Sequence, residues 1–355
     1  MSHRVIISGY YGFDNAGDEA ILAGLAAGLR QLAPDLTPVA LSAAPARTAM
    51  QHGLEAVPRA NLGAVWRALR SADLLLSGGG GLFQDSTSWR TPVYYAGVIR
   101  MARAAGCPVM VCAQGIGPLR GWLGRRMARG GLNHAEAITV RDEASAEMVR
   151  ALGVRRPAEV TADASYLLDP PARDDAAAER TLLVCLRGDV GDPDFASRII
   201  AGLGRAVREL GLDAVVVTMQ PARDLALGRQ LASDIPGARR LETPDRPADL
   251  LAHFGHVGMV LSMRLHGLIF AHLAGAVPVG ISYDPKVDAF LAGLGLRSLG
   301  RPDEVTAESL SRALTTAWND RASMRARLQE MLPGRREAAR RNIELAGEIA
   351  ARSRS

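Results

Sequence analysis

Two stretches in the second half of the chain combine residue types that can bind a small anion and move a proton on it. In LSMRLHG, Arg264 and His266 directly follow an apolar run, and in SYDPK, Ser282 and Lys286 follow the next apolar run. Polar side chains that follow neighbouring strands of a parallel sheet gather at one edge of it, where ligands bind. Two cations, an imidazole and a hydroxyl at such an edge suit a phosphate or a carboxylate. A lone histidine is more often structural, so the flanking cations are what make His266 a candidate.

Other cations extend this set. Lys286 is the only lysine among 42 basic residues, and a compositional bias toward arginine explains most of that pattern. A lysine that persists in such a chain is a candidate for a position that a planar guanidinium cannot fill. Arg187 in LLVCLRGD follows another apolar run, and either anion binding or a surface salt bridge with Asp189 explains it. Arg141 in ITVRDEAS is likewise open between anion binding and a surface Arg–Asp pair.

The loop GYYGFDNAGDEAIL, residues 9–22, places acidic and amide side chains at the start of a predicted helix. Asp and Asn are favoured there as helix caps, and acidic side chains suit the N-terminal dipole. Capping accounts for one or two of these side chains but hardly for all of them. We therefore expect acid or base chemistry by Asp14 or Asp18, and sugar binding by Asn15. The glycine spacing differs from GxGxxG, so this loop is not a dinucleotide fingerprint.

A second loop, SGGGGLFQDSTS, opens with four consecutive glycines after a strand-like run: Gly78, Gly79, Gly80 and Gly81. Glycine runs expose backbone N–H groups and lose roughly 0.5–1 kcal/mol per residue relative to alanine within regular structure. A merely structural turn would rarely need all four, so we predict close approach of a substrate here. Gln84 and Asp85, which follow, and Gln114 in AQGIGPL are predicted to hold acceptor hydroxyls.

Short apolar runs alternate with helical stretches along the whole chain, which is typical of βαβ units and parallel sheets. The predicted strands are residues 5–8, 38–41, 74–77, 108–113, 137–140, 182–186, 214–218, 258–261 and 278–282. Helices are predicted at 16–32, at 141–152 and from 307 onward, with a break at Pro333-Gly334. The Pro- and charge-rich segment 168–180 is predicted to link two domains.

These elements predict an α/β protein with two Rossmann-like domains that face each other across a cleft. We expect an N-terminal acceptor-side domain at residues 1–172, a C-terminal donor-side domain at 173–320 and an Arg-rich helical tail at 321–355. The residues that could do chemistry all follow predicted strands, so the carboxyl edges of the two sheets must position them.

Composition excludes several classes of protein. The chain has 355 residues, is 48% hydrophobic and 22% charged, and has a formal net charge of +5 with no nucleic-acid-binding motif. Its three cysteines, Cys107, Cys112 and Cys185, lie in apolar runs without zinc-site spacing, and we expect neither a metal nor a cofactor. No signal-like start and no apolar run of about 18 residues is present. We expect a cytoplasmic protein.

The sequence resembles the polysaccharide pyruvyl transferases, and most closely their cell-surface-anchoring branch. The resemblance is carried by six motifs that occur in this order: GYYGFDNAGDEAIL, SGGGGLFQDSTS, AQGIGPL, VRDEAS, RLHG and SYDPK. The resemblance covers roughly residues 4–300. It implies a two-domain fold of the GT-B glycosyltransferase type. It also implies transfer of pyruvate from phosphoenolpyruvate onto two hydroxyls of one sugar as a cyclic ketal, with release of phosphate.

In that branch the implied acceptor is N-acetylmannosamine on a lipid-diphosphate precursor of a secondary cell-wall polymer, whose ketal carboxylate is recognised by S-layer homology domains. The resemblance implies that the donor-binding residues are Arg141, Arg264, His266 and Lys286. We expect His266 to contact and protonate the departing phosphate. A GT-B glycosyltransferase using a nucleotide sugar and a non-catalytic glycan-binding protein are the alternatives.

A lipid-linked acceptor implies contact with the inner face of the membrane. The stretch PLRGWLGRRMARGGL, residues 118–132, mixes Trp122 with four arginines, which suits either an interfacial helix or an amphipathic helix packed on the sheet. The tail from Arg321 also contains glutamates, which favours a solvated helix. The oligomeric state stays open.

Overall fold

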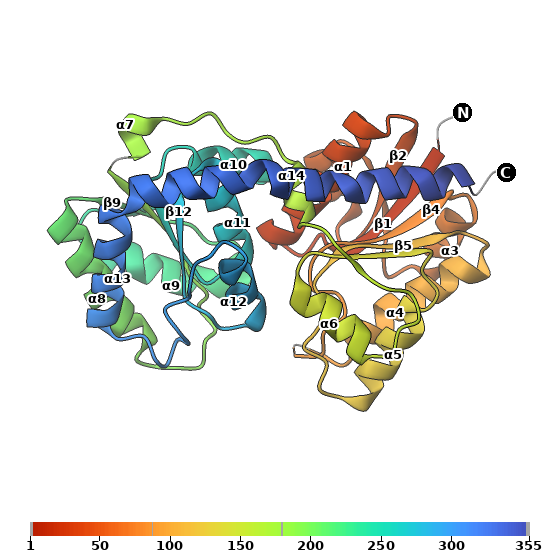
Figure 1. The fold of residues 1–355 in the computed structure, drawn as a ribbon, viewed down its shortest axis with the longest axis horizontal. Coiled ribbons are helices and arrows are strands. Elements are labelled where there is room, and N and C mark those ends of the chain that lie inside the picture. The colour runs from red at the N-terminus through yellow and green to blue at the C-terminus, as the bar shows by residue number, and fades with distance from the viewer. Residues whose placement is uncertain (1–2, 87, 179, 353–355) are drawn as a thin grey trace. The chain divides into compact units, whose positions relative to one another are not determined.

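The computed structural model describes residues 3–86, 88–178 and 180–352, and these divide into two compact units. Unit 1 comprises the residues up to Phe13, those from Asp18 to Leu168 and those from Gly334 onward. Unit 2 comprises Asp14–Gly17 and Asp169–Pro333. The boundary at Leu168 falls within the segment predicted as a linker. Figure 1 shows that each unit has its own sheet with helices on both faces.

Unit 1 is built on a parallel sheet of seven strands among the described residues, in the order β3-β2-β1-β4-β5-β6-β7. The strands are β1 (His3–Tyr11), β2 (Leu36–Ser42), β3 (Glu55–Pro58), β4 (Leu74–Gly78), β5 (Val109–Gln114), β6 (Ala137–Val140) and β7 (Glu159–Val160). The central strands β4 and β5 are buried on both faces, as their continuous apolar sequences require. The strand order reverses between β1 and β4, which makes this point of the carboxyl edge the expected ligand crevice.

The helices of unit 1 cover this sheet. They are α1 (Ala16–Leu32), α2 (Pro45–His52), α3 (Leu62–Arg70), α4 (Arg90–Ala104), α5 (Trp122–Leu132), α6 (Glu143–Ala151) and the 3-10 helix η1 (Ala164–Leu167). One apolar core joins the inner sides of α3, α4, α5 and α6 to the sheet. Because α4 and α5 follow β4 and β5, their N-terminal ends lie at the carboxyl edge.

Unit 2 repeats the plan with a parallel sheet of five strands among the described residues, in the order β10-β9-β8-β11-β12. The strands are β8 (Thr181–Cys185), β9 (Asp213–Val216), β10 (Ala238–Arg240), β11 (Met259–Ser262) and β12 (Val277–Gly280). The helices are α7 (Asp175–Ala178), α8 (Phe195–Leu210), α9 (Pro221–Asp234), α10 (Pro247–Phe254), α11 (Leu265–Ala274), α12 (Pro285–Ala292) and α13 (Ala307–Asn319). Here the strand order reverses between β8 and β11.

The prediction of two Rossmann-like α/β domains is confirmed, as is every predicted strand to within a few residues. The prediction missed β3, β7 and β10, which stand at sheet edges. Each of them has at most four residues, none of which is fully buried, and both residues of β7 are exposed, so each sequence lacks the apolar run that identifies a central strand.

The predicted helix break at Pro333-Gly334 is wrong. Helix α14 (Arg321–Arg352) runs through Pro333 without interruption. Tertiary contacts on each side explain this: the Nε2 atom of His272 bonds the Leu328 carbonyl at 2.9 Å, and Asn342 accepts hydrogen bonds from the hydroxyls of Thr139 and Thr161. The predicted tail is therefore not a separate part, since its residues up to Pro333 belong to unit 2 and those from Gly334 to unit 1.

Candidate functional site

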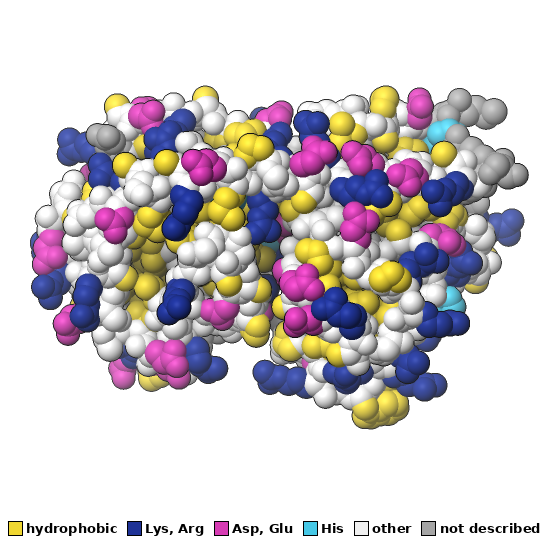
Figure 2. All heavy atoms as spheres, viewed as in Figure 1, with side chains coloured by type: hydrophobic (Ala, Val, Ile, Leu, Met, Phe, Trp, Pro, Cys, Tyr) yellow, Lys and Arg dark blue, Asp and Glu magenta, His cyan; other side chains and the backbone are white. Residues whose placement is uncertain are grey.

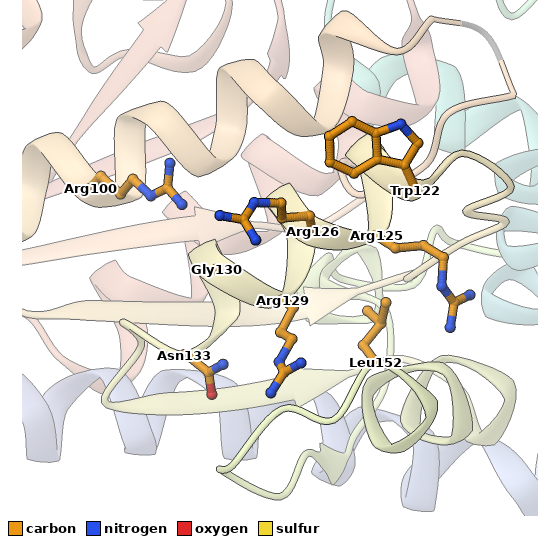
Figure 3. Close-up of a pocket in the computed structure, with 8 residues that line it drawn as sticks. All are labelled: Arg100, Trp122, Arg125, Arg126, Arg129, Gly130, Asn133 and Leu152. Carbon is orange, nitrogen blue, oxygen red and sulfur yellow. The ribbon is translucent and has the colours of Figure 1, made fainter.

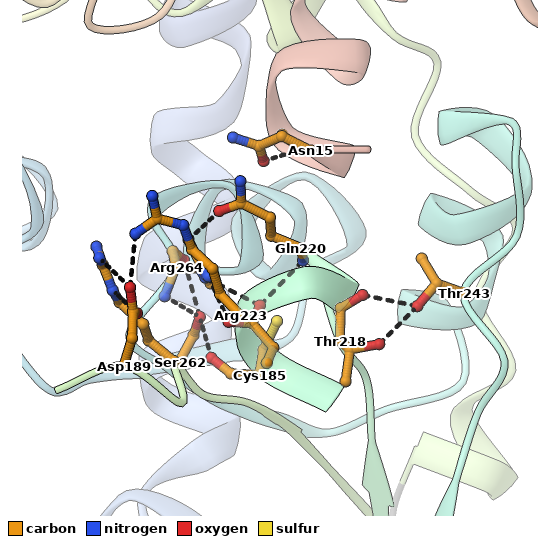
Figure 4. A network of polar contacts seen from close by, with 12 residues as sticks. Asn15, Cys185, Asp189, Thr218, Gln220, Arg223, Thr243, Ser262 and Arg264 are labelled. Carbon is orange, nitrogen blue, oxygen red and sulfur yellow. Dashed lines mark hydrogen bonds and ion pairs between the residues drawn. The ribbon is translucent and has the colours of Figure 1, made fainter. Parts of the chain in front are cut away.

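Arg264 stands at the point of unit 2 where the strand order reverses, directly after β11. The Ser262 hydroxyl accepts its backbone N–H at 2.9 Å, and its guanidinium is held by both carboxylate oxygens of Asp224. Its Nη1 atom also donates to the Gln220 side chain at 3.3 Å. Arg264 is 8% exposed and Asp224 1%, so this is a buried pair (Figure 4). The arginine is fixed in orientation, and its charge is largely compensated.

Asp224 is a residue that sequence reasoning missed. It lies in the first turn of α9, where it also accepts the Gln220 backbone N–H at 2.9 Å. The sequence QPARD signals a helix start with an acidic residue in its first turn. Only the fold shows that this carboxylate faces Arg264, 40 residues later.

His266 lies in the first turn of α11, and its ring packs directly on the backbone of Gly17. A Cβ atom added at Gly17 would lie 2.3 Å from the imidazole Nδ1, so only glycine fits there. The Ala16 N–H donates to the Met219 carbonyl at 2.9 Å, and Asn15 accepts the Gly17 N–H at 3.2 Å. Figure 4 shows Asn15 near Gln220 and Arg264. Within unit 2, the segment Asp14–Gly17, which contains the predicted acid or base Asp14, therefore lies against His266.

Asp14 has a left-handed backbone, with φ of 54°, and its side chain is exposed. Such a conformation is uncommon for a residue other than glycine and is found at functional turns more often than elsewhere. Asp18, the other predicted acid or base, belongs to unit 1. The two candidates are therefore in different units.

Lys286 lies in the first turn of α12, with its ammonium 3.0 Å from the Asp284 carboxylate. The Tyr283 ring is shared by two cations, since the Arg187 guanidinium lies 4.7 Å and the Lys286 ammonium 5.5 Å from its centroid. Ser282 is buried and donates its hydroxyl to the Asp288 carboxylate. These contacts hold the side chains near the ends of β8 and β12.

Arg187 forms the salt bridge with Asp189 that was the alternative to anion binding, through both carboxylate oxygens. Arg223 also donates to Asp189, at 2.5 Å. Partial burial alone would raise the pKa of the Asp189 carboxyl, but hydrogen bonds and charge from the two arginines outweigh it and lower that pKa. This carboxylate therefore stays ionised and organises both cations.

The glycine loop of unit 1 has a packing explanation for three of its four glycines. An added Cβ would lie 2.9 Å from Leu25 at Gly78, 2.1 Å from Ile21 at Gly79 and 2.8 Å from Asp18 at Gly80. All three contacts are with α1, which lies close over the end of β4. At Gly81 the nearest atom would be 3.9 Å away. Packing against α1 thus gives a structural reason for glycine at these three positions but not at Gly81, and the approach of a substrate to this loop stays a prediction.

Asp85 and Gln114 also have structural partners. The Asp85 carboxylate accepts the backbone N–H groups of Arg120 and Gly121, at distances from 2.7 to 3.0 Å, and so fastens the start of α5. The Gln114 amide, fully buried, donates to the carbonyl and hydroxyl of Ser77 at 2.8 Å each. Asp85 therefore holds the loop before α5, and Gln114 links the ends of the neighbouring strands β4 and β5. Gln84 accepts a hydrogen bond from the Ser86 hydroxyl.

Arg141 is buried in unit 1, not on the surface, and it lies against Gly115. Its guanidinium is 3.2 Å from the Asp163 carboxylate and 3.5 Å from that of Asp142. The four predicted donor residues are consequently divided, with Arg141 in unit 1 and Arg264, His266 and Lys286 in unit 2.

A basic cavity of about 550 Å³ lies between α4 and α5 of unit 1 (Figure 3). Arg100 from α4 and Arg125, Arg126 and Arg129 from α5 line it, together with Trp122, which is 75% exposed. In the part of the chain that the structure describes, none of these four arginines is ion-paired with a carboxylate. Within the predicted stretch 118–132, the helix is α5 (Trp122–Leu132). It packs on the sheet through Ala128 and Leu132, and its arginines that line the cavity have no carboxylate partner among the described residues.

Comparisons with known proteins bear on both the fold and the family. A family model described as polysaccharide pyruvyl transferase matches residues 15–285. No curated protein matches the chain significantly. Among solved structures, the chain is similar to the S. aureus MnaA–UDP complex, with a TM-score of 0.64, 12% identity and coverage of 92% of this chain and 91% of that one.

It is also similar to a putative UDP-N-acetylglucosamine 2-epimerase from Listeria monocytogenes, with a TM-score of 0.65, 12% identity and coverage of 96% and 94%. For Acinetobacter baumannii MurG the TM-score is 0.51, the identity 16% and the coverage 97% and 99%. At these identities the likeness shows the fold, which is the GT-B type with two Rossmann-like domains.

Proposed function

We propose, from the premise that this chain belongs to the polysaccharide pyruvyl transferase family, that it transfers pyruvate from phosphoenolpyruvate to a sugar as a cyclic ketal. The observation that carries this proposal is the placement of Arg264, His266 and Lys286 at the carboxyl edge of the unit 2 sheet. The family match spans all but the last of these residues. Arg264 and His266 begin α11 and Lys286 begins α12, and helix N-termini favour anions.

The chemistry requires a proton on the methylene carbon of phosphoenolpyruvate, attack on its C2 by one sugar hydroxyl, and replacement of phosphate at C2 by a second hydroxyl. Each hydroxyl loses its proton, and phosphate leaves with the bonding electrons. His266 contacts and protonates the departing phosphate. Arg264 and Lys286 hold the negative charge, and the two carboxylates beside them fix where those cations stand.

Asp14 or Asp18 serves as the acid or base toward carbon or the sugar hydroxyl. Asp14 is supported by the packing of its segment against His266, and Asp18 by its place at the Gly80 turn. A role for Arg141 in donor binding rests on the family resemblance alone. No metal or cofactor enters the proposed reaction.

The test is phosphate release from phosphoenolpyruvate with a lipid-diphosphate-linked N-acetylmannosaminyl-N-acetylglucosamine acceptor. We expect acceptor-dependent release that falls by at least about 100-fold in His266→Ala and Lys286→Ala, the loss typical of removed acid–base and electrostatic groups. His256→Ala, at an exposed histidine of unit 2, is the matched control. Unchanged variants would refute the donor site. Release of UDP from a UDP-sugar in place of phosphate would favour the glycosyltransferase alternative.

The acceptor we propose, N-acetylmannosamine on a lipid-diphosphate cell-wall precursor, brings the enzyme to the inner face of the membrane from the cytoplasm. Within the described residues, none of the helices combines the length and apolar character needed to cross a membrane. The basic cavity beside Trp122 suits peripheral contact with anionic lipid, since exposed tryptophan and arginine both favour the bilayer interface. Figure 2 shows several dark-blue side chains over the region of α4 and α5, and these are arginines because the only lysine, Lys286, lies in α12.

Co-sedimentation with phosphatidylglycerol vesicles at low salt tests this contact. We expect wild-type protein to bind, and the variants Trp122→Ala and Arg126→Gln to bind less, with neutral phosphatidylcholine vesicles as the control. Equal binding by all variants would show that the α5 surface is not the contact.

A further inference from the structure

Arg59 is a cation of unit 1 that sequence reasoning did not single out. It directly follows β3, at the carboxyl edge of the sheet. Its backbone is fixed on both sides, because its N–H donates to the Ser42 carbonyl at 2.9 Å and its carbonyl accepts the Tyr94 hydroxyl at 3.2 Å. The position of the side chain is therefore set by two neighbouring elements, β2 and α4.

The guanidinium of Arg59 lies in a cage of three aromatic rings. Its central carbon is 4.2 Å from the ring centroid of Tyr94, 5.1 Å from that of Phe13 and 5.5 Å from that of Tyr95. The Nη1 atom donates to the Gly9 carbonyl at 3.1 Å and to the Tyr95 hydroxyl at 3.5 Å. The three rings surround the guanidinium, and the two hydrogen bonds fix its Nη1 atom.

The other edge of this guanidinium is available. In the residues that the structure describes, Nε and Nη2 of Arg59 donate to no carbonyl and to no carboxylate, and no carboxylate pairs with the charge. The guanidinium also interacts with the Tyr94 hydroxyl, which offsets part of the rise in the pKa of Tyr94 that burial causes. These atoms are not enclosed either, since neither belongs to the buried polar atoms that lack a partner. The parallel N–H groups of an Nε/Nη2 edge match two oxygens of a phosphate or carboxylate. A half-buried cation kept without a counter-charge is thus shaped for an anion from outside the chain.

The surroundings of Arg59 suit a sugar. Phe13 stacks on Tyr10 with centroids 4.1 Å apart at the end of β1, beside the reversal of strand order, and both rings are partly exposed. Both Arg59 and Asp18 act electrostatically on the Tyr95 hydroxyl. Burial raises the pKa of Tyr95 most, the charge of Arg59 lowers it, and the charge of Asp18 raises it further. The proposed acid or base Asp18 therefore belongs to the same neighbourhood.

We propose that Arg59 binds an anionic phosphoryl group of the sugar acceptor through its Nε/Nη2 edge, with the aromatic cage holding the guanidinium in place. This inference rests on the proposed function, because it assigns the anion to the acceptor. The assignment follows from where the cations stand, since Arg264, His266 and Lys286, which carry the proposed donor site, lie in unit 2 and Arg59 lies in unit 1. Arg141, the donor residue implied by the family resemblance alone, is also in unit 1, but its guanidinium is paired with Asp163. A neutral sugar alone would leave the charge of Arg59 without a partner.

The experiment compares two acceptors that differ only in charge, the disaccharide diphosphate and the same disaccharide as a neutral methyl glycoside. For Arg59→Met we expect KM for the diphosphate acceptor to rise roughly 10- to 100-fold, the effect of a lost charged hydrogen-bond pair. KM for phosphoenolpyruvate and kcat with the neutral acceptor should stay near wild type. Arg59→Lys keeps the charge but lacks the parallel N–H groups of the guanidinium, so its KM for the diphosphate acceptor should lie between those of wild type and Arg59→Met.

Arg321→Met is the matched control, because Arg321 also lies over an aromatic ring, 4.5 Å from Trp318, and also donates to one backbone carbonyl. Calorimetric titration with inorganic pyrophosphate, without phosphoenolpyruvate, gives a readout independent of turnover. Arg59→Met should lose pyrophosphate affinity and Arg321→Met should keep it. An Arg59→Met protein that keeps both the acceptor preference and the pyrophosphate affinity would overturn the inference. If wild type transfers to neither acceptor, the proposed function fails, and the pyrophosphate titration alone decides the role of Arg59.

Discussion

Arg264 in unit 2 and Arg59 in unit 1 stand at the carboxyl edges of their sheets, yet the protein holds the two cations by different means. Arg264 is buried against both oxygens of Asp224, whereas Arg59 is held by three rings and a backbone carbonyl and, among the described residues, is not paired with a carboxylate. A carboxylate fixes an arginine firmly but cancels its charge. Aromatic rings hold it with less cancellation, since the cation–π contact adds no opposite charge.

This difference indicates which side chains at the carboxyl edge of each sheet are left to bind an anion. In the donor site proposed for unit 2, carboxylates fix the orientation of the cations at the starts of α11 and α12. Among the described residues of unit 1, Asp85 and Gln114 are held by hydrogen bonds within the protein, and the arginines without a carboxylate partner include Arg59 and the four that line the cavity at α4 and α5. Removing a partner should therefore have unequal consequences in the two units.

The largest expected effect is from Asp224→Asn. It leaves the Arg264 charge buried without a carboxylate to compensate it, which should lower the free energy of unfolding by about 3–5 kcal/mol, measured by urea denaturation. Asp163→Asn in unit 1 is the comparison, and it should cost less because Arg141 keeps Asp142 at 3.5 Å. The double variant Arg264→Met/Asp224→Leu should recover much of the loss. If the two Asp→Asn variants lowered the free energy of unfolding equally, the Arg264–Asp224 and Arg141–Asp163 pairs would not differ as proposed.

A smaller effect is expected in the glycine loop of unit 1. Gly79 has φ of 61° and no room beside Ile21, so Gly79→Ala should lower the free energy of unfolding by about 2–4 kcal/mol, from backbone strain and overpacking. Gly81→Ala, with the nearest atom 3.9 Å away, should cost less than about 1 kcal/mol. Thermal denaturation of the pair measures this. A stable Gly79→Ala would mean that α1 does not need to lie so close to β4.

The smallest effect compares one thiol from each unit. Burial raises the pKa of Cys112, within β5, to about 12 and that of Cys185, at the end of β8, also to about 12. Because both folded-state values lie above the unfolded one, both thiols stay protonated and hidden at pH 8, and alkylation should need local opening. Mass-resolved iodoacetamide labelling in increasing urea should then show which unit opens first. Rapid labelling of either residue in native buffer would contradict its burial.

Sequence reasoning predicted the class of the fold because central strands of parallel sheets carry continuous apolar runs, as in 74–77 and 258–261. It missed β3, and with it Arg59, because a four-residue edge strand with half its residues polar or exposed carries no such run. It placed a break at Pro333 because local propensity disfavours proline in a helix, whereas contacts from His272 and Asn342 hold α14 together.

Among the candidate site residues, the order of motifs was enough to identify Arg264, His266 and Lys286 as strand-end groups, since a residue after a parallel strand must reach the carboxyl edge. Their partners could not be predicted in the same way. Asp224 pairs with Arg264 across 40 residues, and Gly17 packs on His266 across a far longer separation. Such pairs depend on the order of strands in the sheet and on helix placement, which a sequence pattern does not specify.

The sequence by itself thus determined the alternation of strands and helices, the family, and which side chains stand at strand ends, because these depend on local periodicity and on motifs contiguous in the chain. Only the tertiary structure decided which of those side chains are paired, which hold loops and which keep an open hydrogen-bonding edge. The reason is physical: the charge that an arginine presents depends on what packs against it, and that is settled when distant segments meet.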